Sequence, residues 1–577
     1  MSFTTRPTVM GTHGMVTSSH YLASEAGNYI LRKGGNAADA GAAMWFVLTV
    51  TKPDLAGVAG EAPILMYISD EEKVIAVNGQ GPAPKAATID WFKARGYDAI
   101  PEDGFLAATV PSAFDAWIIL LEEYGSMSLA EVIEPAIRIA ADGYPIQGSM
   151  VRSINRRADK FRNEWSTSAE IYLPGGEVPK VGQIVRNPAW ARTFQTIAEE
   201  EHRERRWGRI SGLEAARDYF YLGPIAEAIV DFTHTFKCHD CYGQEHYALI
   251  EQEDFADYRA TIEEPIKVNY KGFDVWKCNT WTQGAVLLQQ LNLLEGFNLQ
   301  SMGHNSADYL HIWVECAKLA YADRETYYGD PEFEDIPLHW LLSKDYANER
   351  RKLIDQNNSN LDFRPGGMEP YRMEETQRLG TFEGDTVHLE VIDSTGNMLS
   401  ATPSGAWIPT SPVVPGLGFP IGTRAQQFNL TEGHPNSLKP GKRPRSTLTP
   451  SLVTQEGKPY MVFGTPGGDG QDQWTLQFFL NHIEFGMEIQ LALDKPTIHT
   501  EHFPNSFWPH RVAPNTIHIE PPIGEDVIEA LRKKGHKIIL DQPWSHGRCL
   551  AIRYDPETGV IYGGASPRSN DSYVIGF

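Results

Sequence analysis

Thr386, His388, Thr402 and Ser404 are spaced so that a β-hairpin would bring their side chains together. With a turn at residues 394–396, Thr386 lies opposite Ser404 and His388 lies opposite Thr402. Such a hairpin gathers three hydroxyl groups and one imidazole on one face. A threonine hydroxyl becomes a good nucleophile only when a base removes its proton, so its neighbours decide whether Thr386 can react.

The residue pattern predicts this hairpin. Residues 386–393 alternate between apolar and polar side chains, which is typical of a half-buried strand. Asp393 and Asn397 flank a three-residue turn in which Gly396 can adopt a positive φ. The polar, turn-rich segment 364–385 precedes the strand and indicates a flexible lead-in.

Cleavage between Asp385 and Thr386 would turn Thr386 into an N-terminal residue. Its α-amino group, with a pKa near ~7.7–8.0, would then be partly neutral at cellular pH and able to act as the base. One residue would supply both nucleophile and base. The alternative is an ordinary threonine in a hairpin, which the Thr-x-His pattern alone does not exclude.

A glycine-rich turn is the second candidate element. Residues 464–470 read Gly-Thr-Pro-Gly-Gly-Asp-Gly, between a predicted strand at 460–463 and a predicted helix at 471–485. Gly467 and Gly468 allow backbone N–H groups to line a concave turn at the positive end of that helix. In acyl transfer, each such donor stabilises a tetrahedral oxyanion by roughly 3–4 kcal/mol. A tight turn without a chemical role is the alternative.

Strands and helices interleave along the chain, which predicts an α/β or α+β fold with sheets flanked by helices. Ser128 and Glu131 fit a capping box at the start of one helix. The segment 150–250 is predicted to be largely helical. Further helices are expected at 21–32, 37–49, 128–141, 283–294 and 305–328, and strands at 64–68, 267–276, 515–520, 549–554 and 560–564.

Composition limits the possible partners. The chain has 577 residues, a net charge of −23 and 41% hydrophobic residues. The excess negative charge argues against nucleic acid and anionic membranes. The longest nearly apolar run, residues 40–50, is too short to span a bilayer, and the N-terminal residues have no apolar signal core. We therefore expect a cytoplasmic protein without a membrane anchor.

Two segments contain potential metal ligands. Residues 234–246 hold Cys238 and Cys241 between two histidines, a spacing that zinc sites use. No second cysteine pair supports such a site, so a surface insertion with incidental thiols is favoured. His499 and His502 flank a glutamate, which we interpret as a polar surface loop. Because no ligand set is complete, neither a metal nor an organic cofactor is expected.

Several segments together resemble the γ-glutamyltranspeptidase family in order and spacing, over nearly the whole chain. They are Gly34-Gly-Asn-Ala-Ala-Asp39, Ala317-Lys-Leu-Ala-Tyr-Ala-Asp-Arg324, Asp385-Thr386-Val-His388, Ser400-Ala-Thr402-Pro-Ser404, Lys442-Arg-Pro-Arg-Ser446-Thr447-Leu-Thr-Pro450, Pro466-Gly467-Gly468 and Gly564-Ala-Ser-Pro-Arg568. The resemblance implies an α+β fold, the four-layer αββα sandwich of N-terminal-nucleophile (Ntn) hydrolases. It also implies a precursor that cuts itself into a large subunit, residues 1–385, and a small subunit, residues 386–577, which stay associated as one domain.

The resemblance also implies roles for individual residues. Thr386 would be the nucleophile in self-cleavage and in turnover, with its freed amino group as the base. Ser404 stands where the family has a second threonine that binds this amino group, and it retains the hydroxyl. Gly467 and Gly468 would form the oxyanion hole.

The substrate-binding residues depart from the family pattern. Ser446 and Thr447 correspond to a Ser-Ser pair that holds the acyl donor. Gln80 replaces the arginine that binds the donor's α-carboxylate, and Gln427 replaces the acid that binds its α-ammonium. Ala406 replaces an asparagine. Losing both charged partners of a buried zwitterion should cost several kcal/mol of binding.

Arg424 lies close in sequence to the altered clamp. Either it holds a substrate carboxylate in a new geometry, or it is a solvated loop arginine. His388 and Thr402, on the polar face of the hairpin, are further candidate substrate contacts.

The resemblance favours an autoprocessed amidohydrolase or acyltransferase that cleaves a small amide through an acyl-threonine intermediate. The nearest alternative is a true γ-glutamyltransferase or glutathione hydrolase with a rearranged clamp. An uncleaved, non-catalytic scaffold belongs to another class and would not need Thr386, Ser404 and the paired glycines. The expected partners are the amide substrate and the two subunits of one precursor, and association into a homo-oligomer is left open.

Overall fold

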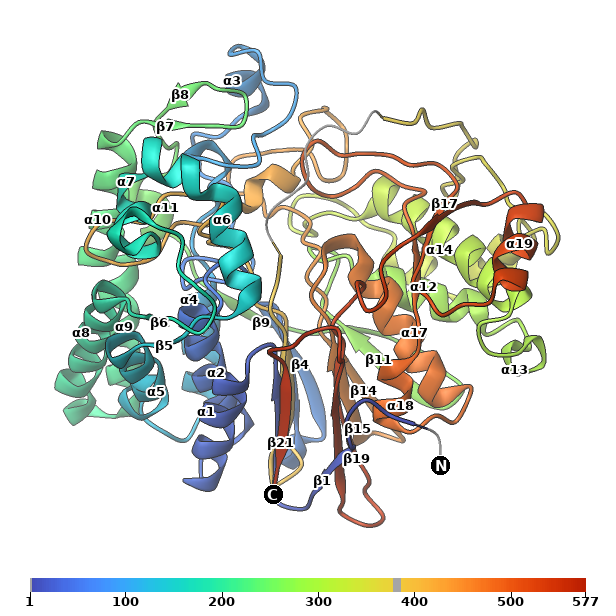
Figure 1. Cartoon of the computed structure of the whole chain (residues 1–577), viewed down its shortest axis with the longest axis horizontal. Coiled ribbons are helices and arrows are strands. Elements are labelled where there is room, and N and C mark those ends of the chain that lie inside the picture. The colour runs from blue at the N-terminus through green and yellow to red at the C-terminus, as the bar shows by residue number, and fades with distance from the viewer. Residues whose placement is uncertain (1–2, 377–384) are drawn as a thin grey trace.

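A computed structural model describes residues 3–376 and 385–577. Two seven-stranded sheets lie face to face at the centre, with helices on the outer side of each (Figure 1). Every strand pair within these two sheets is antiparallel. The predicted four-layer αββα sandwich of an Ntn hydrolase is therefore confirmed.

The first sheet contains the predicted hairpin and is called the hairpin sheet. In spatial order its strands are β21 (Tyr573–Gly576), β2 (Met15–Ser18), β12 (Leu389–Ile392), β13 (Met398–Ala401), β3 (Ile64–Ile68), β4 (Lys73–Asn78) and β9 (Thr261–Glu263). The second sheet leads into the glycine turn and is called the turn sheet. Its strands are β1 (Val9–Gly11), β20 (Ile561–Ala565), β19 (Leu550–Tyr554), β15 (Lys458–Gly464), β14 (Ser451–Gln455), β11 (Phe273–Lys277) and β10 (Ile266–Tyr270).

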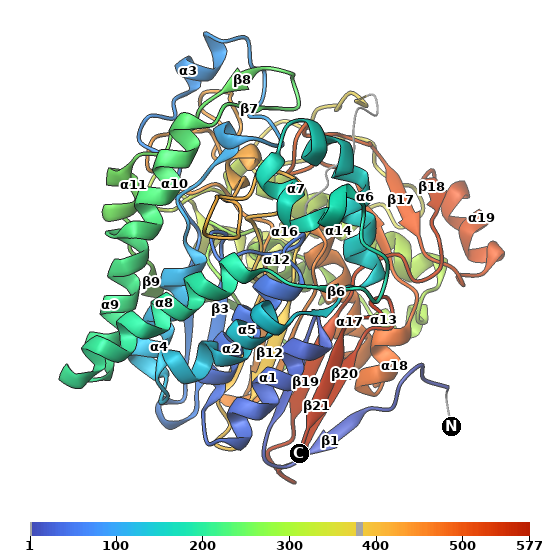
Figure 2. The ribbon, with the colours of Figure 1, turned by 60° about the vertical axis from the view of Figure 1, so that its left-hand side comes forward.

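Alternation along the strands divides the apolar side chains between two faces. In β3, for example, Leu65 packs between the sheets, whereas Ile64 and Met66 pack against the outer helices. The helices covering the hairpin sheet include α1 (Tyr21–Arg32), α2 (Ala37–Thr51), α4 (Ala113–Tyr124), α5 (Leu129–Asp142), α8 (Pro188–Glu204) and α9 (Arg209–Tyr221) (Figure 2). Every residue of α2 is buried, as its apolar sequence predicts.

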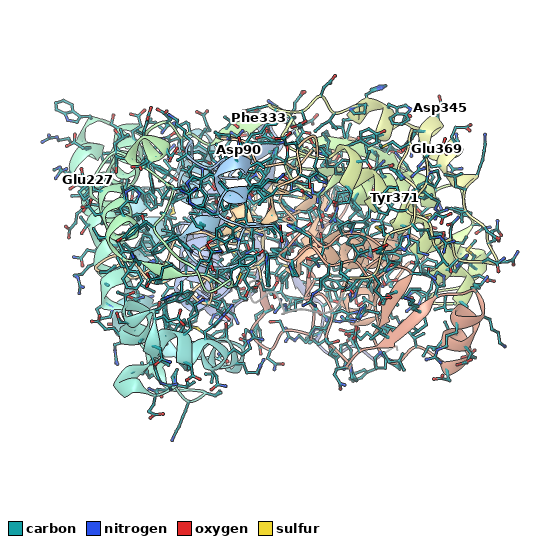
Figure 3. The ribbon with its side chains drawn as sticks, turned by 90° about the horizontal axis from the view of Figure 1, so that it is seen from above. Asp90, Glu227, Phe333, Asp345, Glu369 and Tyr371 are labelled. Atoms are coloured by element: carbon teal, nitrogen blue, oxygen red, sulfur yellow. The ribbon has the colours of Figure 1, made fainter. Side chains whose placement is uncertain are left out.

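The turn sheet is covered by a second helical layer. This layer includes α12 (Ala285–Leu294), α14 (Ala307–Tyr327), α17 (Gln471–Ile483) and α18 (Ile489–Asp494). Seen from above, Glu227 of α10 (Pro224–Thr235) and Asp345 of α16 (Lys344–Arg351) lie at opposite ends of the molecule (Figure 3). Among the described residues, no helix combines the length and apolar character that crossing a membrane requires.

Local patterns located most elements. Helix α1 and strand β3 have the predicted bounds, and the capping box of Ser128 and Glu131 is present. The segment 150–250 is largely helical, from α6 (Gly148–Asn163) through α10. The strand predicted at 267–276 is wrong in one respect: Lys271 and Gly272 form a tight turn, so the segment is the hairpin of β10 and β11.

The hairpin at 386–404 has the predicted register and turn. Leu389 pairs with Ala401, and Gly396 has a φ of +87°. The prediction of a half-buried strand is wrong, because β12 is buried on both faces. Its polar face lies against the turn sheet instead of solvent. Within the predicted lead-in at 364–385, residues 377–384 lie outside the described part of the chain.

A small separate sheet lies beside α19 (Glu525–Lys533). It consists of β16 (Ile498–Thr500), β17 (Thr516–Ile519) and β18 (Lys537–Leu540). His499 belongs to β16, and His502 is fully buried. The predicted surface loop at these two histidines is therefore wrong.

Candidate active site

Thr386 and Ser404 face each other at the open end of the hairpin. They form an isolated antiparallel bridge, and their hydroxyl oxygens lie 3.2 Å apart. Both side chains are buried. The predicted juxtaposition of these two hydroxyls is confirmed.

The peptide carbonyl that precedes Thr386 is held by two side-chain donors. Ser404 Oγ donates to the carbonyl oxygen of Asp385 at 3.0 Å, and Trp407 Nε1 donates to the same oxygen at 2.6 Å. The indole N–H is shared with the carbonyl of Leu55. The side chain of Asp385 forms an ion pair with Arg548. The bond between Asp385 and Thr386 is thus fixed from several sides.

A buried ion pair stands behind Ser404. Arg424 Nη2 donates to Ser404 Oγ at 2.7 Å, and Arg424 Nε donates to Glu61 Oε1 at 2.5 Å. The guanidinium also lies 4.6 Å from the ring centroid of Trp407. Burial raises the pKa of Glu61, and the charge of Arg424 opposes that shift. Because Arg424 is fully buried, the interpretation as a solvated loop arginine is wrong.

The glycine turn lies beside Thr386. Gly467 and Gly468 follow β15 and precede α17, with φ angles of +124° and +53°. A Cβ on Gly467 would overlap the ring of Trp474, so this position requires glycine for space as well as for conformation. Both glycines and Thr386 line the same cavity. Their role as an oxyanion hole stays a prediction that this placement supports.

That cavity has a volume of about 870 Å³. Its wall includes Asp385, Phe507 and Arg548 besides the residues already named. A smaller cavity of about 330 Å³ reaches Thr386 from another side and is lined by Lys52 and Arg548. Thr386 is therefore accessible from two spaces, and Arg548 borders both.

His388 and Thr402 lie between the two sheets. His388 Nδ1 is 2.9 Å from Thr402 Oγ1, and its Nε2 is 2.9 Å from Glu390 Oε1. Burial, aided by the charge of Lys277, lowers the pKa of His388 to about 3. Neither His388 nor Thr402 is among the described residues that line the two cavities. Their position suits a neutral packing role better than the predicted contact with substrate.

The predicted donor-binding residues come from three neighbouring segments. Residues 80–84 join residues 441–443 through backbone hydrogen bonds: the N–H of Ala83 donates to the carbonyl of Lys442, and the carbonyl of Ala83 accepts from the N–H of Gly441. Asn436 links the other two segments: its Nδ2 donates to the carbonyl of Gln427 and its Oδ1 accepts from the N–H of Arg445. Gln80, Gln427, Ser446 and Thr447 are all buried.

These four residues are not among the described residues that line the two cavities. The side-chain amide of Gln427 and the hydroxyl of Thr447 make no hydrogen bond within the described part of the chain. Gln80 uses only its Nε2, which donates to the carbonyl of Gly81. Their predicted contact with the acyl donor stays a prediction.

The cysteine-containing segment does not assemble into a four-ligand site. Cys238 is buried in a short hairpin opposite His246. His234 Nε2 lies 2.9 Å from the carbonyl oxygen of Ile250. The groups of three or more potential ligands found among the described residues do not include Cys238 or Cys241.

Sequence patterns missed Glu61, Trp407 and Arg548. Each contacts the site from a segment with no periodic or motif signal. Glu61 lies 363 positions before its partner Arg424, and Arg548 lies 163 positions after Asp385. The only local hint was Trp407, a large aromatic residue three positions beyond Ser404.

Comparison with known proteins identifies the family. A family model described as Gamma-glutamyltranspeptidase matches residues 23–576. This chain belongs to the γ-glutamyltranspeptidase family. It is therefore an autoprocessed Ntn amidohydrolase or acyltransferase, and the non-catalytic scaffold is not supported.

Individual relatives differ in their activities. The chain is 32% identical to the glutathione hydrolase-like YwrD proenzyme of Bacillus subtilis (strain 168), over 98% of this chain and 99% of that protein. It resembles the solved structure of LmbA2991HD with 42% identity and a TM-score of 0.94, over 100% of both chains. It also resembles cephalosporin acylase from Bacillus halodurans with 32% identity and a TM-score of 0.85, over 100% of this chain and 98% of that one.

Breaking the Glu61–Arg424 pair by removing one partner should destabilise the fold. In a Thr386→Ala background, which keeps every variant a single chain, Arg424→Ala should lower the free energy of unfolding by roughly 3–5 kcal/mol, because it leaves Glu61 buried without a countercharge. Glu61→Gln combined with Arg424→Met should cost clearly less than the sum of the single changes. Urea denaturation measures both values.

The matched control is the exposed pair of Glu349 and Lys352, with 70% and 67% of their side chains exposed. Lys352→Ala should cost about 0–1 kcal/mol. Equal effects of Arg424→Ala and Lys352→Ala would contradict the assignment of a structural role to the buried pair.

Proposed function

We propose that the chain cuts itself between Asp385 and Thr386 and then uses Thr386 to hydrolyse or transfer the acyl group of a small amide. The observation that carries this proposal is the Asp385 carbonyl, which accepts hydrogen bonds from Ser404 and Trp407 next to the Thr386 hydroxyl. Donors placed at this oxygen stabilise the charge that develops on it when the hydroxyl attacks.

Self-cleavage would proceed as an N-to-O acyl shift. Thr386 Oγ1 bonds to the carbonyl carbon of Asp385, its proton passes to the peptide nitrogen, and the C–N bond breaks, which frees the amino group of Thr386. Water then hydrolyses the ester, which releases the Asp385 carboxylate and restores the Thr386 hydroxyl. Ser404 Oγ has one proton, so donation to Asp385 leaves its lone pairs to accept from Arg424 and Thr386.

The two products would be a large subunit, residues 1–385, and a small subunit, residues 386–577. Strands β2 and β3 of the first segment pair directly with β12 and β13 of the second. Separation would break these ladders and expose the core between the sheets, so the subunits should stay together.

In turnover, the amino group of Thr386 would take the hydroxyl proton while Oγ1 attacks the substrate amide. The amine leaves with that proton, and an acyl-threonine remains. Gly467 and Gly468, which line the same cavity, would donate their N–H groups to the oxyanion. Attack by water gives hydrolysis, whereas attack by a second amine gives transfer.

Arg548, a cation on the wall of both cavities, would bind a substrate carboxylate. Arg424 already holds Glu61 inside the protein, so the carboxylate site predicted at Arg424 moves to Arg548. In the uncleaved chain Arg548 pairs with Asp385, which becomes the new carboxyl terminus after cleavage. When the Asp385 carboxylate moves away, the Arg548 guanidinium, which also lies near Asp54 and Asp571, would become available to a substrate carboxylate on the wall of both cavities.

We therefore propose acyl donors that carry a lone carboxylate, such as glutaryl or oxamate-like amides. A γ-glutamyl donor adds an ammonium, and the position of the family's ammonium-binding acid holds Gln427 in this chain. The relative named cephalosporin acylase supports an acyl donor other than a γ-glutamyl compound, whereas the glutathione hydrolase-like relative supports the γ-glutamyl alternative.

The first prediction concerns self-cleavage. The wild-type chain should give two bands on a denaturing gel, near two-thirds and one-third of the full length, and Thr386→Ala should give one. Trp407→Phe keeps an aromatic side chain but removes the indole N–H donor, so precursor conversion should slow by roughly 10²–10³-fold. The control Trp340→Phe changes a half-exposed tryptophan and should convert at the wild-type rate. An active wild-type chain that stays intact would rule out this mechanism.

The second prediction concerns the donor. With p-nitroanilide as the common leaving group, kcat/KM should be at least about tenfold higher for the glutaryl than for the γ-glutamyl compound, because Gln427 replaces the acid that pairs with the ammonium of the latter. In processed enzyme, Arg548→Gln should lower glutaryl turnover at least about tenfold while pentanoyl turnover changes little. Faster γ-glutamyl turnover would establish the ordinary transpeptidase reaction instead.

A further inference from the structure

Three histidines and two carboxylates gather at the small sheet beside the catalytic cavity. They are His499, His518, His546, Glu501 and Asp541. We propose that His499, His518 and Glu501 form a site for one divalent first-row transition-metal ion of the Zn²⁺ type. The ion would take no part in acyl transfer at Thr386.

The sheet itself aligns the two histidine ligands. His499 of β16 pairs directly with His518 of β17, and directly paired residues project to the same face of an antiparallel sheet. Their rings are stacked with centroids 4.6 Å apart and planes inclined by 8°. Glu501 follows β16 immediately. These three residues offer ligand atoms that all lie within 4.8 Å of one another.

Asp541 orients the imidazole of His518 for metal binding. Asp541 Oδ2 lies 3.0 Å from His518 Nδ1 and 2.9 Å from His546 Nε2. A carboxylate that accepts from one imidazole nitrogen fixes the proton there and leaves the other nitrogen with a free lone pair. His518 Nε2 then faces Glu501 Oε2 at 3.4 Å. Two ligands on a tetrahedral zinc, each bonded at about 2.0–2.1 Å, are separated by about the same distance.

One ring nitrogen of the cluster lacks a polar partner. His499 Nδ1 is buried and forms no hydrogen bond with any described residue. His518 Nε2 is also buried and has the Glu501 carboxylate at 3.4 Å as its polar neighbour. Buried polar atoms are normally satisfied, so the unpartnered nitrogen of His499 beside the His518–Glu501 contact indicates a missing ligand.

The site opens towards the substrate. His499, Glu501 and His518 all line the cavity that contains Thr386. Trp474 separates them from the glycine turn: its ring centroid lies 5.3 Å from that of His499, and its other edge covers Gly467. With three protein ligands, a fourth coordination position faces the cavity, as in open zinc sites. The fourth coordination position of the ion would bind an anionic group, such as a thiolate, of the acyl donor or of the acceptor.

Isothermal titration of the purified full-length protein with ZnCl₂ in metal-free buffer tests the proposal. One Zn²⁺ should bind per chain. His518→Ala and Glu501→Gln should each weaken the Kd at least tenfold, and Asp541→Asn should weaken it roughly tenfold through loss of the supporting carboxylate. Co²⁺ should show visible d–d absorption in the wild type that disappears in His518→Ala.

The control His339→Ala removes an exposed histidine of α15 (Leu338–Leu341) and should leave binding unchanged. Circular dichroism checks that each variant is folded. If a histidine variant does not fold, the Glu501→Gln variant alone tests the ligand assignment. Absence of zinc binding, or binding that survives the His518 and Glu501 changes but is lost in a Cys238→Ser/Cys241→Ser double variant, would overturn the assignment. Because the readouts are binding and absorption, failure here does not bear on the acyl-transfer proposal.

Discussion

The hydroxyl of Ser404 is the point on which the site depends. It contacts the nucleophile Thr386, the carbonyl of Asp385 and the guanidinium of Arg424. A serine hydroxyl can rotate freely, and its orientation here is fixed by the Arg424–Glu61 pair. Burying two charges costs free energy that their attraction only partly returns. We attribute the presence of this pair to positioning, since an apolar pair would pack at lower cost.

Two glycines lie where the backbone approaches the Arg424–Glu61 pair closely. A Cβ on Gly60 would overlap the backbone oxygen of Ser404, and a Cβ on Gly405, with its φ of +76°, would overlap the carboxylate of Glu61. Both glycines therefore permit the approach that the ion pair requires. Further polar groups lie between the sheets: Lys277 Nζ donates to Thr449 Oγ1 at 2.7 Å and pairs with Asp472 in the first turn of α17. This contact ties the helix behind the glycine turn to the turn sheet.

Patterns within one segment could be predicted from the sequence, whereas contacts between distant segments could not. The hairpin register followed from alternation and from the Asp393–Asn397 turn, and the bounds of α1 followed from helical periodicity. The turn at Lys271–Gly272 was missed although the apolar positions change from even to odd numbers there, with Val268 and Tyr270 before the turn and Phe273 and Val275 after it. Burial of the polar face of β12 was also missed, since one strand does not show what covers it.

The site was predicted in the same uneven way. Thr386, Ser404 and the paired glycines followed from the hairpin, the turn chemistry and the resemblance to the family. Trp407, Arg548 and the partner of Arg424 depend on how separate segments pack. The histidine cluster was missed because His499 was compared with its sequence neighbour His502, whereas its partner across the sheet is His518.

Trapping the acyl-enzyme tests the central claim most directly. The purified protein is mixed with a glutaryl amide, quenched in acid within the first turnover and digested, and its peptides are mapped by mass spectrometry. The account predicts a small fragment whose first residue is Thr386 and whose mass is raised by one glutaryl group on that residue. An adduct on another side chain, or a fragment that begins at a different residue, would contradict it.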